Sequence, residues 1–170
     1  MKKVLFVVDL QKQFKDDKGQ YEKCLKYIEE NKDSYDYIIG TAFQNLSGSL
    51  YETKLDYHDC KSLADSDIEY THDEIVLKLA EYGISEMRVV LSGIRISLRD
   101  DFDVHVIGCD SDACVLAIAF NLWDQGAEFK ILSDLVYTTA TDFSNDDVLK
   151  IMKRNFGSCI TTSSEVWGGH

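Results

Sequence analysis

The sequence predicts an α/β fold in which a mainly parallel sheet lies between two layers of helices. Short apolar, β-branched runs of strand length recur along the chain, and longer segments with helical spacing separate them. Strands that are apolar throughout are typical of a sheet covered on both faces, and their alternation with helices favours parallel connections. The 170 residues contain no linker, repeat or low-complexity tract, so we expect one domain over residues 1–170.

The predicted elements alternate along most of the chain. We expect strands at residues 3–9, 35–41, 73–78, 102–108, 128–133 and 159–162. We expect helices at residues 21–30, 50–60, 86–92, 113–125 and 146–156. Ser85 is a candidate N-cap for the third helix, and Gly126 is a candidate stop signal for the fourth.

Charge and composition exclude several classes of function. The formal net charge is −12 at pH 7, and no basic run offsets it, so we expect no binding to nucleic acid or to anionic membranes. The longest apolar runs fall far short of the ~20 residues that span a bilayer. The first residues also lack the pattern of a secretory signal, which predicts a cytoplasmic protein.

The cysteines show no spacing typical of zinc ribbons or of dithiol redox sites. A cytoplasmic location makes free thiols the expectation. The five are Cys24, Cys60, Cys109, Cys114 and Cys159.

Three reactive side chains fall at the carboxyl ends of predicted strands, where open parallel sheets bind ligands. Asp9 and Lys78 each close a strand, and Cys114 opens a helix. A helix N-terminus and a nearby lysine both favour a thiolate, and an aspartate within reach accepts the thiol proton. Taken singly, each has another explanation. Asp9 is also expected of a turn or of a phospho-acceptor site, Lys78 of a solvated surface, and Cys114 of a packed core. Together they indicate a nucleophilic cysteine.

These residues lie in motifs that resemble those of the isochorismatase-like cysteine hydrolases, the superfamily that includes the nicotinamidases. FVVDLQKQF, at residues 6–14, resembles the opening D-x-Q-x-D-F motif, and GCDSDACV, at residues 108–115, resembles the nucleophile turn G-x-x-[ST]-[DE]-x-C-V. IVLKLAEYG places a lysine between them at the usual spacing. The resemblance covers nearly the whole chain and implies a three-layer α/β/α, Rossmann-like sandwich.

The resemblance also implies a mechanism. Asp9, Lys78 and Cys114 correspond to a catalytic triad that hydrolyses a small amide or related C–N substrate through a thioester. The backbone N–H groups of Asp110 and Cys114 correspond to the oxyanion hole, and a cis peptide is implied between Cys109 and Asp110. The family further implies a homodimer or a larger homo-oligomer.

The sequence departs from the nicotinamidases where those enzymes bind a metal. Residues 40–52, GTAFQNLSGSLYE, contain no histidine, so we expect no catalytic metal and no other cofactor. Gln13 replaces the second acidic residue of the opening motif. No two histidines have metal-ligand spacing; they are His58, His72, His105 and His170.

Phe14, Phe43, Tyr82 and Tyr137 are candidates for the apolar wall of a pocket for a small-molecule substrate. Residues 42–52 resemble the same stretch of small bacterial members of the superfamily. Three alternatives stay open: ether hydrolysis of the isochorismatase type, which does not require the cysteine; a non-catalytic binding protein; and a thiol redox sensor in which Cys109 resolves an oxidised Cys114.

Overall fold

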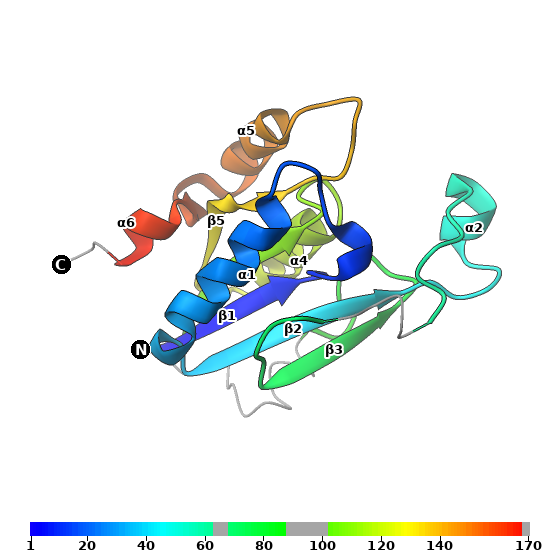
Figure 1. Cartoon of the computed structure of the whole chain (residues 1–170). Coiled ribbons are helices and arrows are strands. Elements are labelled where there is room, and N and C mark those ends of the chain that lie inside the picture. Colours follow the sequence, from blue (N-terminus) through cyan, green and yellow to red (C-terminus); the bar gives the residue numbers. More distant parts are fainter. Residues whose placement is uncertain (63–67, 88–101, 168–170) are drawn as a thin grey trace.

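The computed structural model describes residues 1–62, 68–87 and 102–167. Its strands form one six-stranded sheet in the order β3-β2-β1-β4-β5-β6 (Figure 1). The strands are β1 (Lys2–Val8), β2 (Tyr37–Gln44), β3 (Glu74–Leu79), β4 (Phe102–Cys109), β5 (Phe129–Tyr137) and β6 (Ile160–Thr161). The helices are α1 (Gln20–Asn31), α2 (Leu50–Leu55), α4 (Cys114–Asp124), α5 (Asn145–Phe156) and α6 (Ser163–Trp167). Short 3-10 turns are η1 (Lys12–Phe14), η2 (Lys32–Ser34) and η4 (Gly157–Cys159).

The predicted fold class is confirmed, because every strand pair in the sheet is parallel and helices flank it. The last predicted strand is shorter than expected, and the sequence analysis did not predict α6, which follows it. The helix predicted over residues 86–92 lies largely outside the described residues. In the described ranges, no helix is long and apolar enough to cross a bilayer.

The helix predicted at residues 50–60 ends early, at Leu55. Asp56 adopts a left-handed backbone conformation (φ 53°), and its N–H closes the final turn onto the carbonyls of Tyr51 and Glu52. This conformation ends the helix and redirects the chain.

Helices cover both faces of the sheet, which explains why β1 is apolar from Val4 to Val8. Successive strand residues point to opposite faces. Leu5 and Val7 accordingly pack in the cluster that contains residues of α1, whereas Val4, Phe6 and Val8 pack in the cluster that contains residues of α4 and α5. The part of β1 that is buried on both sides, Val4–Val8, has no position for a polar residue, and Lys2 and Lys3 lie at the less buried start of the strand.

The strand order reverses between β1 and β4, and such a switch point leaves a crevice beyond the carboxyl ends of the strands. Gly108 lets the two strands approach closely there. It has φ +115°, and a Cβ at this position would lie 2.1 Å from the Val8 carbonyl oxygen. The close approach places Asp9, the next residue after Val8, beside the turn that follows β4.

Candidate active site

Asp9 and Lys78 form a buried ion pair at the carboxyl edge of the sheet. Lys78 Nζ lies 2.7 Å from Asp9 Oδ2, and both side chains are closed to solvent. Lys78 Nζ also donates to the carbonyls of Tyr82, at 2.6 Å, and Glu81, at 3.3 Å. The buried ammonium therefore has an anion and two carbonyl oxygens around it, as a buried charge requires.

Thr41, buried in β2 between β1 and β3, fixes the Asp9 carboxylate. Its hydroxyl donates to Asp9 Oδ1 at 2.5 Å and accepts the Asp9 backbone N–H at 3.0 Å. Asp9 itself has φ 44°, a region that non-glycine residues rarely occupy and that often marks functional sites. Thr41 was not predicted as a site residue; its hydroxyl among buried apolar strand residues was the available signal.

Cys114 is the first residue of α4, and its thiol lies close enough to Asp9 and Lys78 for both charges to shift its pKa. The structure thus brings the three predicted residues together. Burial raises the pKa of the Cys114 thiol well above its ordinary value; Asp9 raises it further, and Lys78 lowers it. Burial of the sulfur thus opposes the thiolate that the helix N-terminus and the lysine favour. A carboxylate suited to accept the thiol proton lies beside it.

This pKa shift predicts how alkylation of Cys114 depends on pH. The rate with iodoacetamide should rise through a midpoint above the ordinary thiol value of about 8.5, since only the thiolate reacts. Asp9→Asn should lower the midpoint, because the carboxylate raises the thiol pKa, and Lys78→Met should raise it. Peptide mass spectrometry over a pH series measures the rates. A midpoint below the ordinary value in the parent protein would contradict the raised pKa of the Cys114 thiol.

The turn between β4 and α4 presents two backbone N–H groups beside this thiol. The Cys109–Asp110 peptide is cis, as the resemblance implied. The Asp110 carbonyl accepts the amides of Ala113 and Val115, at 3.1 and 3.0 Å. Within the described part of the chain, the amides of Asp110 and Cys114 donate to no acceptor. Free amides at a helix N-terminus are suited to bind an anion.

Contacts from the segment after β5 hold this turn in place. The Ser111 amide donates to the Tyr137 carbonyl at 2.7 Å, and the Ser111 hydroxyl donates to Asn145 Oδ1 at 2.6 Å. Asp110 Oδ1 accepts the Thr139 amide at 2.7 Å. The carboxylate of Asp110 therefore has a structural partner within the turn.

Cys109 packs on the opposite face of the sheet from Cys114. It is buried in the cluster that contains residues of α1, and its thiol donates to the Asp9 carbonyl at 3.3 Å. Cys114 packs against the other cluster. This placement does not favour Cys109 as a resolving thiol for Cys114.

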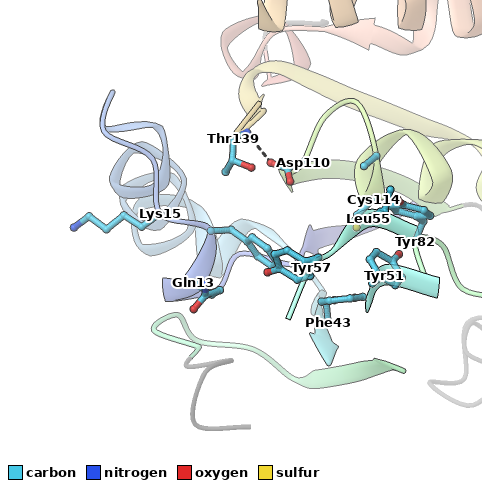
Figure 2. Close-up of a pocket in the computed structure, with 12 residues that line it drawn as sticks. Gln13, Lys15, Phe43, Tyr51, Leu55, Tyr57, Tyr82, Asp110, Cys114 and Thr139 are labelled. Atoms are coloured by element: carbon cyan, nitrogen blue, oxygen red, sulfur yellow. Dashed lines mark hydrogen bonds between the residues drawn. The ribbon is translucent and has the colours of Figure 1, made fainter. Parts of the chain in front are cut away.

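A cavity of about 460 Å³ opens beside Cys114 (Figure 2). Three of the four predicted wall residues, Phe14, Phe43 and Tyr82, line it. Tyr137 does not: it is buried, and its hydroxyl donates to the Phe14 carbonyl at 2.9 Å, so it supports the wall from behind. The other lining residues are Gln13, Lys15, Tyr51, Leu55, Tyr57, Asp110, Ala113, Cys114 and Thr139.

Gln11 explains how Phe43 reaches the cavity. Its buried side-chain amide donates to the Phe43 carbonyl at 3.2 Å and accepts the Phe43 amide at 2.6 Å. This pair of bonds imitates the pairing of a neighbouring strand and continues β2 toward the site. The glutamine of the opening motif thus positions one wall of the pocket.

The described residues contain no group of three histidine, cysteine or acidic side chains placed to hold a metal ion. His58 is mostly exposed and pairs with Asp56 at 2.9 Å, outside the cavity wall. His105 is buried between the Tyr35 hydroxyl, at 2.8 Å, and Asp103, at 3.0 Å, which indicates a structural role. His170 lies outside the described residues.

No family model and no curated protein matches this sequence. Solved structures do match. An isochorismatase-like hydrolase from Alkaliphilus metalliredigens has a TM-score of 0.77 at 15% identity, covering 99% of this chain and 98% of that one. The zinc complex of Pyrococcus horikoshii pyrazinamidase has a TM-score of 0.72 at 19% identity, covering 95% and 99%. N-carbamoylsarcosine amidase from Thermoplasma acidophilum has a TM-score of 0.71 at 18% identity, covering 95% of each chain. At these identities the likeness establishes the fold, and over nearly its whole length this chain has the fold of the isochorismatase-like hydrolases.

Proposed function

We propose that this protein is a cysteine hydrolase that cleaves the C–N bond of a small amide through a thioester on Cys114, without a metal ion. One observation carries the proposal: the buried ion pair of Asp9 and Lys78 contacts a thiol that lines a cavity. The nucleophile, a proton acceptor and a fixed cation are thus adjacent, as covalent catalysis requires. The free amides of Asp110 and Cys114 add an oxyanion site.

The first half-reaction forms the thioester. As the Cys114 sulfur attacks the amide carbon, its proton passes to Asp9, and the carbonyl π electrons move to oxygen. The amides of Asp110 and Cys114 stabilise that oxyanion, and one such donor contributes roughly 2.7–4 kcal/mol. The oxyanion then collapses, the C–N bond breaks, and Asp9 returns the proton to the leaving amine.

The second half-reaction releases the acyl group. Asp9 takes a proton from water as the water oxygen attacks the thioester carbon. Collapse of the second tetrahedral intermediate breaks the C–S bond, and the sulfur recovers the proton. Lys78 keeps its charge throughout, and its contacts to carboxylate and thiol hold both groups in position.

The residues of this pocket do not fit the zinc seen in the pyrazinamidase complex. Among the residues that line the cavity, Asp110 and Cys114 alone belong to the histidine, cysteine and acidic ligand set. Asp110 already accepts the Thr139 amide, and Cys114 contacts the ion pair. Catalytic zinc typically has three protein ligands, whereas this cavity offers two candidate ligands that already have other partners.

Ammonia release from a panel of small primary amides tests the proposal. The parent protein should hydrolyse at least one member. Cys114→Ala should lower that rate by about 10⁴-fold or more, because the residual groups do not replace a nucleophile. Cys159→Ala, which removes a partly buried thiol outside the cavity wall, is the matched control and should keep the parent rate.

Two results would contradict the proposal. An alanine variant of Cys114 that turned over the same amide at the parent rate would remove the nucleophile from the mechanism. Hydrolysis of an enol ether by that variant, with no amide hydrolysed by the parent, would favour ether hydrolysis of the isochorismatase type. Equal melting temperatures of parent and variant confirm that both are folded.

A further inference from the structure

Tyr51 in α2 has a buried hydroxyl with no hydrogen-bond partner among the described residues. A buried donor left unsatisfied costs about 1–3 kcal/mol, so nearly all such groups in native proteins have a partner. Tyr51 also lines the cavity beside Cys114. Its hydroxyl is therefore a donor at the site for which the described chain supplies no acceptor.

Tyr51 belongs to an aromatic wall of the cavity that Cys114 also lines. Figure 2 shows its ring between Phe43 and Tyr82, and the ring centroids are 4.8 and 4.9 Å away. Burial raises the pKa of Tyr51, and the charge of a Cys114 thiolate raises it further. The phenol thus remains protonated when the sulfur ionises, and it acts as a donor next to the reacting atom.

Tyr82 is the polar neighbour of this hydroxyl, but it does not satisfy it. Burial raises the pKa of Tyr82, and a contact from the Tyr51 hydroxyl opposes that rise. The contact falls outside hydrogen-bond geometry. The Tyr82 side chain is also 45% exposed, so it can turn toward solvent and leave the Tyr51 donor to a ligand.

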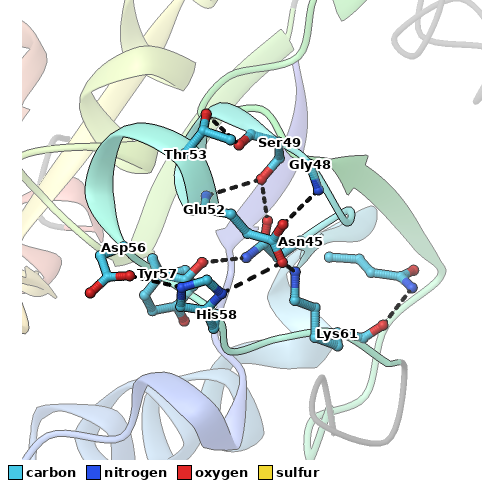
Figure 3. A network of polar contacts seen from close by, with 10 residues as sticks. Asn45, Gly48, Ser49, Glu52, Thr53, Asp56, Tyr57, His58 and Lys61 are labelled. Carbon is cyan, nitrogen blue, oxygen red and sulfur yellow. Dashed lines mark hydrogen bonds and ion pairs between the residues drawn. The ribbon is translucent and has the colours of Figure 1, made fainter.

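A network of polar contacts fixes the short helix that carries Tyr51 (Figure 3). Ser49 caps α2 by accepting the Glu52 amide at 3.3 Å, and its hydroxyl donates to Asn45 Oδ1 at 2.6 Å. Asn45 Nδ2 donates to the Tyr57 carbonyl at 2.8 Å, and Glu52 pairs with Lys61. A helix of six residues is not stable alone, so these bonds hold the hydroxyl in place.

We propose that the Tyr51 hydroxyl binds the substrate and selects amides that carry a second hydrogen-bond acceptor, an oxygen or nitrogen near the scissile carbonyl. The inference rests on the proposed function, because it assigns specificity to the pocket of Cys114. The carbonyl oxygen itself is assigned to the amides of Asp110 and Cys114. The donor of Tyr51 is thereby left for a different acceptor atom of the same substrate.

Matched amides that differ by one ether oxygen test this selection. The pairs are methoxyacetamide with butyramide, and 3-methoxypropanamide with pentanamide. In at least one pair the parent should favour the ether by about tenfold in kcat/KM, the worth of one neutral hydrogen bond. Tyr51→Phe should abolish that preference by slowing the ether, leaving the alkyl amide within about twofold. A parent without preference, or a variant that retains it, overturns the proposal.

Tyr70→Phe is the matched control. Tyr70 also has a buried hydroxyl without a partner among the described residues, but it does not line the cavity. Its variant should keep the preference for the ether. The melting temperature of Tyr51→Phe should equal or exceed that of the parent, because an unsatisfied hydroxyl is removed. A fall in melting temperature together with an equal loss on both amides would show a structural role instead.

Aldehydes separate failure of this inference from failure of the proposed function. The Cys114 sulfur adds to an aldehyde carbon, and the thiol proton passes to the new alkoxide, which gives a reversible hemithioacetal without turnover. Protection of Cys114 from iodoacetamide measures the affinity for the four aldehydes that match the amides. Preference of the parent for an ether aldehyde, lost in Tyr51→Phe, supports the donor even if no amide is hydrolysed. Equal protection by both members of each pair refutes it.

Discussion

Lys78→Met is expected to lower the free energy of unfolding by about 3–5 kcal/mol, because it leaves the Asp9 carboxylate buried without its cation. Methionine keeps most of the apolar stem of the side chain but removes the ammonium group, and with it the charge and the bonds to the carbonyls of Tyr82 and Glu81. Turnover of the amide should fall by about 10²–10³-fold, since the fixed cation no longer positions thiol and carboxylate. Urea unfolding followed by circular dichroism, and ammonia release at equal protein concentration, measure the two effects.

The double variant Asp9→Asn/Lys78→Met measures how much of the stability comes from the interaction between the two residues. With both charges removed, the loss in unfolding free energy should be smaller than the sum of the two single losses by about 1–3 kcal/mol. Lys23→Met, at an exposed ion pair with Asp134, is the control and should scarcely change stability. Additive single losses would show that Asp9 and Lys78 do not stabilise each other.

Gly108→Ala is expected to be the most damaging single-methyl change, at about 3–5 kcal/mol. The added Cβ would lie 2.1 Å from the Val8 carbonyl oxygen and 2.9 Å from two further backbone atoms of Val8. Backbone in the centre of a sheet cannot yield as a flexible side chain does. The two strands must separate, which moves Asp9 away from the turn of Cys114. Activity should therefore fall together with the melting temperature.

Gly126→Ala provides the comparison for this glycine. Gly126 also has a positive φ, +68°, but nothing lies within 4 Å of its would-be Cβ. Its substitution should cost only the left-handed backbone penalty of about 1–2 kcal/mol and leave turnover intact. Similar losses at the two positions would show that conformation, and not the contact with Val8, decides the effect at Gly108.

The sequence predicted the strands well, because each apolar run has one explanation in a sheet covered on both faces. The limits of β1 and β4 fall within one or two residues of the prediction, whereas β2 and β5 extend three and four residues beyond their predicted ends. Helix α2 was predicted too long, because periodicity does not indicate the left-handed backbone conformation of Asp56 that ends it. Helix α6 was missed because five residues carry too little pattern.

The residues of the candidate site also divide into those that the sequence predicted and those that it did not. Asp9, Lys78 and Cys114 were found at the ends of elements that the apolar pattern marks, and the motif resemblance indicated that they act together. Tyr51 and Tyr137 were not distinguishable from core aromatics by sequence. Their positions depend on how a loop folds across the strand ends, and that is set by long-range bonds such as Tyr137 to the Phe14 carbonyl.

The buried ion pair also sets the charge balance of the proposed reaction. With the sulfur protonated, the cluster of Asp9, Lys78 and Cys114 carries one negative and one positive charge, which sum to zero. In the proposed formation of the thioester, one proton moves from sulfur to carboxylate to nitrogen within the cavity. An uncharged amide would thus react without changing the local charge, whereas the protein as a whole, with a net charge of −12, repels anionic competitors at long range.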